Sequence, residues 1–217
     1  MDEIPIEYVI SVDLGQAQDY TAIAVIERRQ KKASSDPIYK LRHVERAPLG
    51  TNYETVVDRV AQIITSDQIA HGLNYLVLDM TGVGVPIFDM FDNRGLQPIG
   101  IHIHGGDNVS RDGRKFRVPK RDLVGAVQVL LQNGRFKMSP HLELYQELFN
   151  ELTNFKMKID PKTAHDSYAA WREADHDDLV LSVAMGLWWL EKRNRPIMFD
   201  SMPVDEETGL GYQGLVA

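Results

Sequence analysis

The sequence predicts an α/β fold built on a mixed sheet. Three apolar segments rich in β-branched residues open the chain, near residues 8–13, 21–27 and 39–46. Short or polar connections join these segments, so we expect them to form an antiparallel meander. Two further strands, near residues 74–79 and 97–103, alternate with helical patterns, which is typical of α/β proteins.

Apolar residues at helical spacing predict the helices. The first covers residues 52–71, and Thr51 or Asn52 provides its N-cap. Further helices are predicted at 85–95, 121–134, 140–155 (with Pro140 near its start) and about 177–192, and a hairpin at 156–171. Pro and Gly punctuate the sequence from Pro196 onward. We therefore expect one domain over residues 1–195 and a loosely ordered tail over 196–217.

The composition excludes several classes of protein. The chain has 217 residues, 43% of them hydrophobic, which suits one domain with a real core. It contains no cysteine, which excludes disulfides and thiolate metal sites. The acidic N-terminus lacks the apolar core of a secretion signal, and no apolar run approaches the roughly 18 residues of a membrane span. We therefore expect no membrane partner.

One basic segment lies on an acidic chain. Residues 111–121, RDGRKFRVPKR, carry six Arg or Lys and one Asp, whereas the whole chain has a net charge of −7. The segment contributes +5 and leaves −12 for the remaining residues. We expect this segment to be a loop, made adaptable by Gly113, that binds the phosphates of double-stranded DNA. The alternative is a solvated charged loop with no ligand. The candidate contacts are Arg114, Lys115, Arg117, Lys120 and Arg121.

Aspartates stand where predicted elements end or begin. Asp13 and Asp79 each close an apolar strand and precede a glycine-containing turn, whereas Asp177 and Asp178 open an apolar helix. If the two strands are parallel neighbours, both carboxylates emerge at one carboxyl edge, where open α/β sheets bind ligands. Singly, each aspartate is also explained as a turn former or as a partner of the helix dipole.

Carboxylates that meet in one cleft repel one another unless cations neutralise them. Oxygen ligands suit Mg²⁺ or Mn²⁺, and two such ions roughly 3.5–4 Å apart can hydrolyse a phosphodiester. We expect Asp13, Asp79 and Asp178 to be catalytic, with Asp177 as a further metal ligand. Asp178 shares a helical face with the small residues Ser182 and Gly186, which let the helix approach the sheet.

The sequence resembles the nuclease domain of large terminase subunits from tailed bacteriophages. The resemblance is carried by VDLGQAQDYTAIAV, LVLDMTGVGVPIFDMF, VPKRDLVGAVQVLLQNGRF and HDDLVLSVAMGLWW. It implies a ribonuclease-H-like fold with helices on both faces of the sheet, and an endonuclease that cuts concatemeric viral DNA with two metal ions. It maps the acidic cluster onto Asp13, Asp79, Asp177 and Asp178.

The same resemblance implies partners and a place of action. In the full protein these are a packaging ATPase domain, a small terminase subunit and the capsid portal, in the cytoplasm of the infected bacterial host. The chain contains no GxxxxGK[ST] phosphate loop, so we expect the nuclease domain without translocation.

Three alternatives remain open. A RuvC-type junction resolvase would use a similar carboxylate geometry on a different substrate. An actin or sugar-kinase type ATPase is suggested by VISVDLG, but QAQDY then follows where those proteins carry Thr- or Ser-rich phosphate contacts. The basic segment alone would also fit a non-catalytic DNA-binding module, in which the acidic cluster would disfavour DNA.

Overall fold

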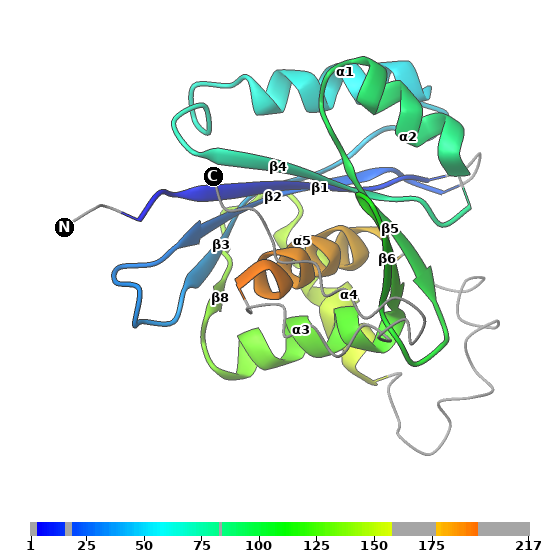
Figure 1. Ribbon diagram of the computed structural model, residues 1–217. Helices are drawn as coiled ribbons and strands as arrows, with labels where there is room; N and C mark the ends of the chain where they lie inside the picture. The colour runs from blue at the N-terminus through cyan, green and yellow to red at the C-terminus, as the bar shows by residue number, and fades with distance from the viewer. Residues whose placement is uncertain (1–3, 16–18, 83, 158–176, 195–217) are drawn as a thin grey trace, which may run out of the picture.

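The computed structural model describes residues 4–15, 19–82, 84–157 and 177–194. Most of the hairpin expected at 156–171 and the tail expected at 196–217 lie outside these ranges. Among the described residues, eight strands form one sheet in the order β6-β7-β5-β4-β1-β2-β3-β8 (Figure 1). The strands are β1 (Glu7–Asp13), β2 (Ala22–Arg29), β3 (Ile38–Arg46), β4 (Leu73–Asp79), β5 (Ile99–His104), β6 (Ser110–Asp112), β7 (Lys115–Pro119) and β8 (Phe136–Lys137).

The sheet is mixed, as the sequence predicts. Strand β2 runs antiparallel to both β1 and β3, which confirms the leading meander. Strand β4 runs parallel to β1, and β5 runs parallel to β4. The central order β3-β2-β1-β4-β5 with these directions is that of the ribonuclease-H-like fold, so the predicted fold class is confirmed.

Helices cover both faces of the sheet (Figure 1). One layer contains α1 (Tyr53–Ile64) and α2 (Gly84–Asn93), and the other contains α3 (Lys120–Gln132), α4 (Tyr145–Met157) and α5 (Asp178–Asn194). Asn52 caps α1, because its Oδ1 accepts a 2.8 Å hydrogen bond from the Thr55 amide. The predicted start of α4 near Pro140 is wrong: turns precede Tyr145, whose amide donates to the Leu142 carbonyl. No described helix is long and apolar enough to cross a membrane.

The expectation that residues 111–121 form a free loop is also wrong. Strands β6 and β7 make a hairpin, with Gly113 at its turn in the left-handed region (φ 56°), and α3 begins directly afterwards. Phe116 and Val118 are buried and alternate with cationic residues along β7, which pairs with β5. This alternation makes the segment a strand despite its high charge.

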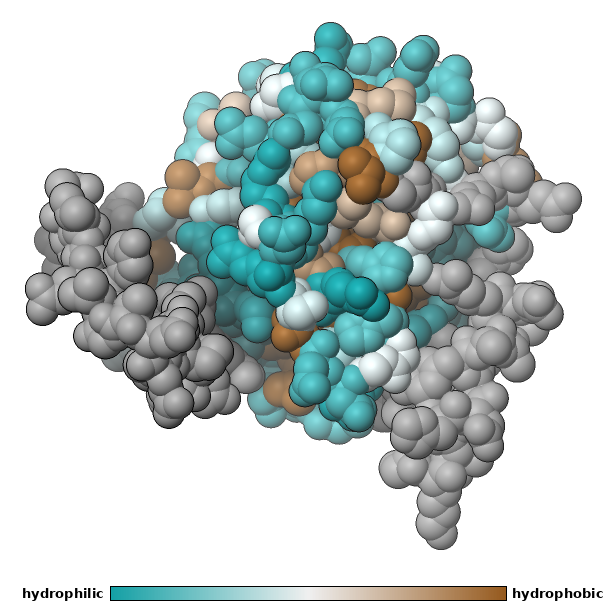
Figure 2. All heavy atoms as spheres, turned by 45° about the vertical axis from the view of Figure 1, so that its right-hand side comes forward, coloured by the Kyte–Doolittle hydropathy of each residue, from teal (hydrophilic) through white to brown (hydrophobic). Residues whose placement is uncertain are grey.

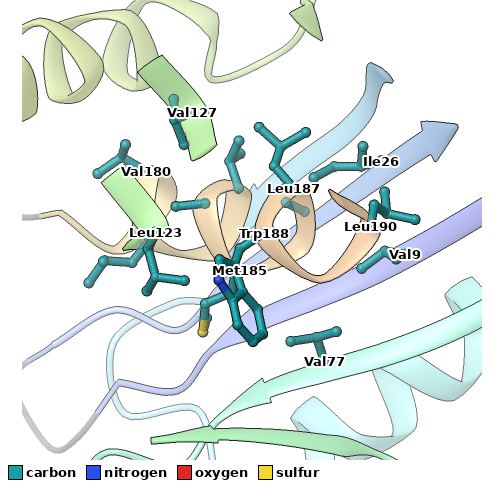
Figure 3. Close-up of a cluster of buried hydrophobic side chains, with 14 of the residues drawn as sticks. Val9, Ile26, Val77, Leu123, Val127, Val180, Met185, Leu187, Trp188 and Leu190 are labelled. Atoms are coloured by element: carbon teal, nitrogen blue, oxygen red, sulfur yellow. The ribbon is translucent and has the colours of Figure 1, made fainter. Parts of the chain in front are cut away.

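Helix α5 lies closest to the sheet. In Figure 3 its side chains lie among labelled residues of β1 (Val9), β2 (Ile26), β4 (Val77) and α3 (Leu123 and Val127). A Cβ atom at Gly186 would lie 2.8 Å from Ile26 Cδ1, 3.2 Å from Ser11 Cβ and 3.3 Å from Val9 Cγ1. Ser182, one turn earlier, is fully buried. The predicted close approach through small residues is therefore confirmed.

We expect Gly186→Val to destabilise the protein by about 1–3 kcal/mol, because overpacking forces the helix or the strands to shift. At about 2–4 °C per kcal/mol for a chain of this size, thermal unfolding measures the loss. The matched control is Gly125→Ala on α3, where a Cβ meets no atom within 4 Å, so higher helix propensity should raise stability by up to about 1 kcal/mol. Wild-type stability in Gly186→Val would contradict the close packing.

Candidate active site

One row of residues crosses the carboxyl edge of the sheet. Asp13 pairs with Ala22 of β2, and Ala22 pairs with Arg46 of β3. Val12 pairs with Leu78 of β4, so the next residues along these parallel strands, Asp13 and Asp79, lie side by side. Adjacent strands are about 4.8 Å apart, which brings Arg46, Asp13 and Asp79 within one small area.

The row faces α5. Side chains alternate between the two faces of a strand, and Val9 and Ser11 of β1 contact Gly186 of that helix. Asp13 follows Ser11 by two residues and therefore points to the same face. Strands β3 and β4 bury Val44 and Val77 in the core beneath α5, and Arg46 and Asp79 follow each of these by two.

The N-terminus of α5 supplies the other two aspartates. The Leu181 amide donates to the Asp177 carbonyl at 2.9 Å, so Asp177 is the N-cap residue and Asp178 the first helical residue. Asp178 is 7% exposed and Asp79 is also buried. The Thr81 amide donates to Asp79 Oδ1 at 2.6 Å, which fixes that carboxylate at the end of β4.

The four predicted aspartates lie within electrostatic range of one another. Burial raises the pKa of Asp13 well above its ordinary 3.8, and the carboxylates of Asp79, Asp177 and Asp178 raise this pKa further. Asp13 and Asp79 are also within hydrogen-bonding reach of each other. The structure therefore brings together all four residues that the sequence singles out as an acidic cluster.

Two cations partly neutralise this cluster. Arg46 binds Asp178 through both carboxylate oxygens, at 2.6 Å from Nε and 3.0 Å from Nη2. Lys120 Nζ lies 3.1 Å from Asp177 Oδ2. Each cation holds one aspartate of the α5 pair, and the described residues contain no group of three or more His, Asp or Glu gathered around one point. The donor set, four carboxylates and no nitrogen or sulfur, fits Mg²⁺ or Mn²⁺.

Sequence reasoning missed Arg46 and Glu151. Arg46 ends β3 much as Asp13 ends β1, so the same strand-end signal marks it. Glu151 lies in the middle of α4 and carries no such signal. Its side chain pairs with Arg46 and accepts a 2.9 Å hydrogen bond from the Val180 amide. Burial raises the pKa of Glu151 to about 7, although the Val180 amide acts in the opposite direction.

The five predicted DNA contacts do not share one environment. Arg114 pairs with Asp92 at 2.7 Å, Lys120 pairs with Asp177, and Arg121 Nη1 lies 2.5 Å from Asp107. Lys115 and Arg117 instead line a hollow of 520 Å³. The hollow is also lined by Arg111 and by the apolar residues Met80, Val85 and Phe116. Arg111 belongs to the basic segment but is not one of the five predicted contacts.

The sequence matches no protein-family model and no curated protein. Among solved structures, the chain is similar to the RuvC structure from Thermus thermophilus, with 11% identity and a TM-score of 0.43. The similarity covers 86% of this chain and 95% of that one. A likeness of this degree assigns no activity, so function must be inferred from the site itself.

We expect metal-free Asp13→Asn to melt at a higher temperature than metal-free wild type at about pH 7.5. A raised pKa means that the folded protein holds the Asp13 proton more tightly than the unfolded chain does. Ionisation therefore costs stability as the pH rises above 3.8, and asparagine avoids this cost. Scanning calorimetry in EDTA should show the difference shrinking toward about pH 4. A variant that melts at or below wild type at about pH 7.5 would contradict the repulsion.

Proposed function

We propose that this protein is a metal-dependent DNA endonuclease that hydrolyses phosphodiester bonds. The observation that carries the proposal is the meeting of four aspartates from two parallel strands and one helix beside a cation-lined hollow. Acidic residues alone would repel a polyanion, and a basic surface alone would bind without reacting. The acidic row faces α5 and the hollow opens toward α2, but both lie near the carboxyl edge of the sheet, since Met80 and Gly82, which line the hollow, follow Asp79. Their combination at this edge fits a site that holds a phosphodiester and cleaves it.

Asp13, Asp79 and Asp178 would hold the divalent ions, with Asp177 as the further ligand. Two Mg²⁺ or Mn²⁺ ions held there would supply a nucleophilic water at neutral pH and stabilise the charge on the leaving oxygen. The chain's own contribution is to keep the carboxylates still. Asp13 is fixed at the end of a buried strand, the Thr81 amide holds Asp79, and Arg46 orients Asp178 with two hydrogen bonds.

The hollow between β6-β7 and the start of α2 is the proposed path of the DNA backbone. Figure 2 shows this side of the molecule, where hydrophobic residues are framed by hydrophilic ones. Arg111 lies over the Phe116 ring at 5.2 Å and Lys115 over the Phe88 ring at 4.7 Å. Within the described residues no carboxylate forms an ion pair with Arg111, Lys115 or Arg117, although Asp112 lines the same hollow and Lys115 helps to lower the pKa of Asp92. The three cations are therefore the candidates for phosphate contacts.

Within this activity, we favour cutting of concatemeric viral DNA during genome packaging. The support is the set of motifs that resemble terminase nuclease domains, now seen to contribute Asp13, Asp79 and Asp178 to one edge of the sheet. A packaging ATPase domain, a small terminase subunit and a capsid portal would then be the partners, in the host cytoplasm. Linear or plasmid duplex should be cut more readily than a four-way junction, and the reverse preference would favour a junction resolvase.

We expect Asp13→Asn to reduce Mn²⁺-dependent plasmid cleavage to below about 1% of wild type, because loss of metal charge stabilisation costs several kcal/mol in the transition state. Asp178→Ala should be more damaging than Asp177→Ala, because Asp178 is the more buried residue and is held by Arg46. The control is Asp89→Asn, an exposed aspartate on α2. Wild-type cleavage by Asp13→Asn would refute the two-metal proposal, and a larger loss in Asp177→Ala would reverse the assignment of the pair.

We expect Lys115→Ala/Arg117→Ala to weaken binding to all duplex sequences alike. Each lost phosphate contact lowers the slope of log K against log salt by about one unit, so the double variant should lose about two. Arg121→Ala is the matched control, because Arg121 is already neutralised by Asp107 and should change the slope little. The titration uses the inactive Asp13→Asn protein at several salt concentrations. A larger change in Arg121→Ala would place the DNA surface at the start of α3.

A further inference from the structure

Glu151, a residue of α4, caps the N-terminus of a different helix, α5. An N-cap side chain normally accepts a hydrogen bond from the amide of the second or third helical residue. In α5 the third residue is Val180, and its amide donates at 2.9 Å to Glu151 Oε2, from α4. The N-cap residue of α5 is Asp177, which has the right side chain for this bond but does not form it.

The Asp177 side chain points elsewhere as a consequence. Its Oδ2 lies 3.1 Å from Lys120 Nζ, at the start of α3, and its charge still acts on Asp13. A carboxylate oxygen can accept more than one hydrogen bond or ion contact, so this pairing leaves acceptor capacity unused. A capping bond to Val180 would instead turn the carboxylate back onto its own helix.

Arg46 connects the capping residue to the other aspartate. Its guanidinium pairs with Glu151 and, through two hydrogen bonds, with Asp178. The three side chains are only 19%, 9% and 10% exposed, in the order Arg46, Glu151 and Asp178. Because partly buried charges need their partners, removing one member would free the others to rearrange.

We propose that Glu151 is a positioning residue for the metal ligands. By capping α5 in place of Asp177 and sharing Arg46 with Asp178, it keeps both aspartates directed at the acidic edge of the sheet. This inference rests on the proposed nuclease function. Glu151 would not itself be a metal ligand, since its two oxygens are used by the Val180 amide and Arg46.

The test compares Glu151→Ala, Glu151→Gln and wild type by calorimetric Mn²⁺ titration and by cleavage over a range of Mn²⁺ concentrations. Alanine removes the cap, so Asp177 turns to Val180, and the dissociation constant for Mn²⁺ should rise about 10–100-fold. The rate at saturating Mn²⁺ should stay near wild type. Glutamine keeps an oxygen for the Val180 amide but loses the ion pair with Arg46, so it should restore part of the affinity. The control is Glu147→Ala, an exposed glutamate one turn earlier on α4.

The outcomes separate this inference from the function on which it rests. If wild type neither binds Mn²⁺ nor cleaves DNA, the proposed function fails and the inference falls with it. If wild type does both and Glu151→Ala binds Mn²⁺ equally well, only the positioning role is wrong. Equal losses in Glu151→Gln and Glu151→Ala, with a low rate at saturating Mn²⁺, would make the charge itself essential and identify Glu151 as a ligand.

Discussion

The close packing of α5 on β1 and β2 determines where the acidic groups of this protein lie. Gly186 and Ser182 place little side-chain bulk between the helix and the strands, so the helix begins just above the carboxyl edge of β1. Aspartate has a short side chain, and a helix held even one side chain further away would separate Asp178 from Asp13. The apolar contact and the polar cluster are therefore consequences of one packing arrangement.

This arrangement brings negatively charged side chains close together, and their mutual repulsion destabilises the fold. Other residues of the site offset part of this repulsion. Arg46 and Lys120 each neutralise one aspartate of α5, and Glu151 takes over the cap of that helix. Among the described residues no cation pairs with Asp13, and burial together with the repulsion of the neighbouring carboxylates raises its pKa. A divalent cation among these carboxylates would remove most of that repulsion, which is why metal binding and stability should be coupled in this protein.

Much of the fold follows from local signals. The apolar segments rich in β-branched residues predict β1 to β5, and the Asn52 cap and the Gly95 and Gly134 stops bound their helices as expected. The short strands β6, β7 and β8 were not predicted. They are two to five residues long, and pairing with a neighbouring strand stabilises them. High charge also concealed the alternation of β7.

The candidate site also has a part that the sequence predicts and a part that it does not. Asp13, Asp79 and the Asp177–Asp178 pair stand at the ends of elements, and sequence order alone places such residues at one edge once the strands are parallel. Ion pairs between residues far apart in the chain leave no comparable pattern in the sequence. That Arg114 and Arg121 are neutralised, and that Glu151 reaches α5, depends on contacts between residues 14 to 29 positions apart in the chain.

A crystal structure of the protein soaked in Mn²⁺ tests the central claim most directly, since anomalous scattering locates the ions without reference to activity. The account predicts two peaks roughly 3.5–4 Å apart, bounded by Asp13, Asp79 and the Asp177–Asp178 pair. It also predicts that Glu151 remains on the Val180 amide. Absence of manganese from this edge of the sheet, or its binding only elsewhere on the surface, would contradict the account.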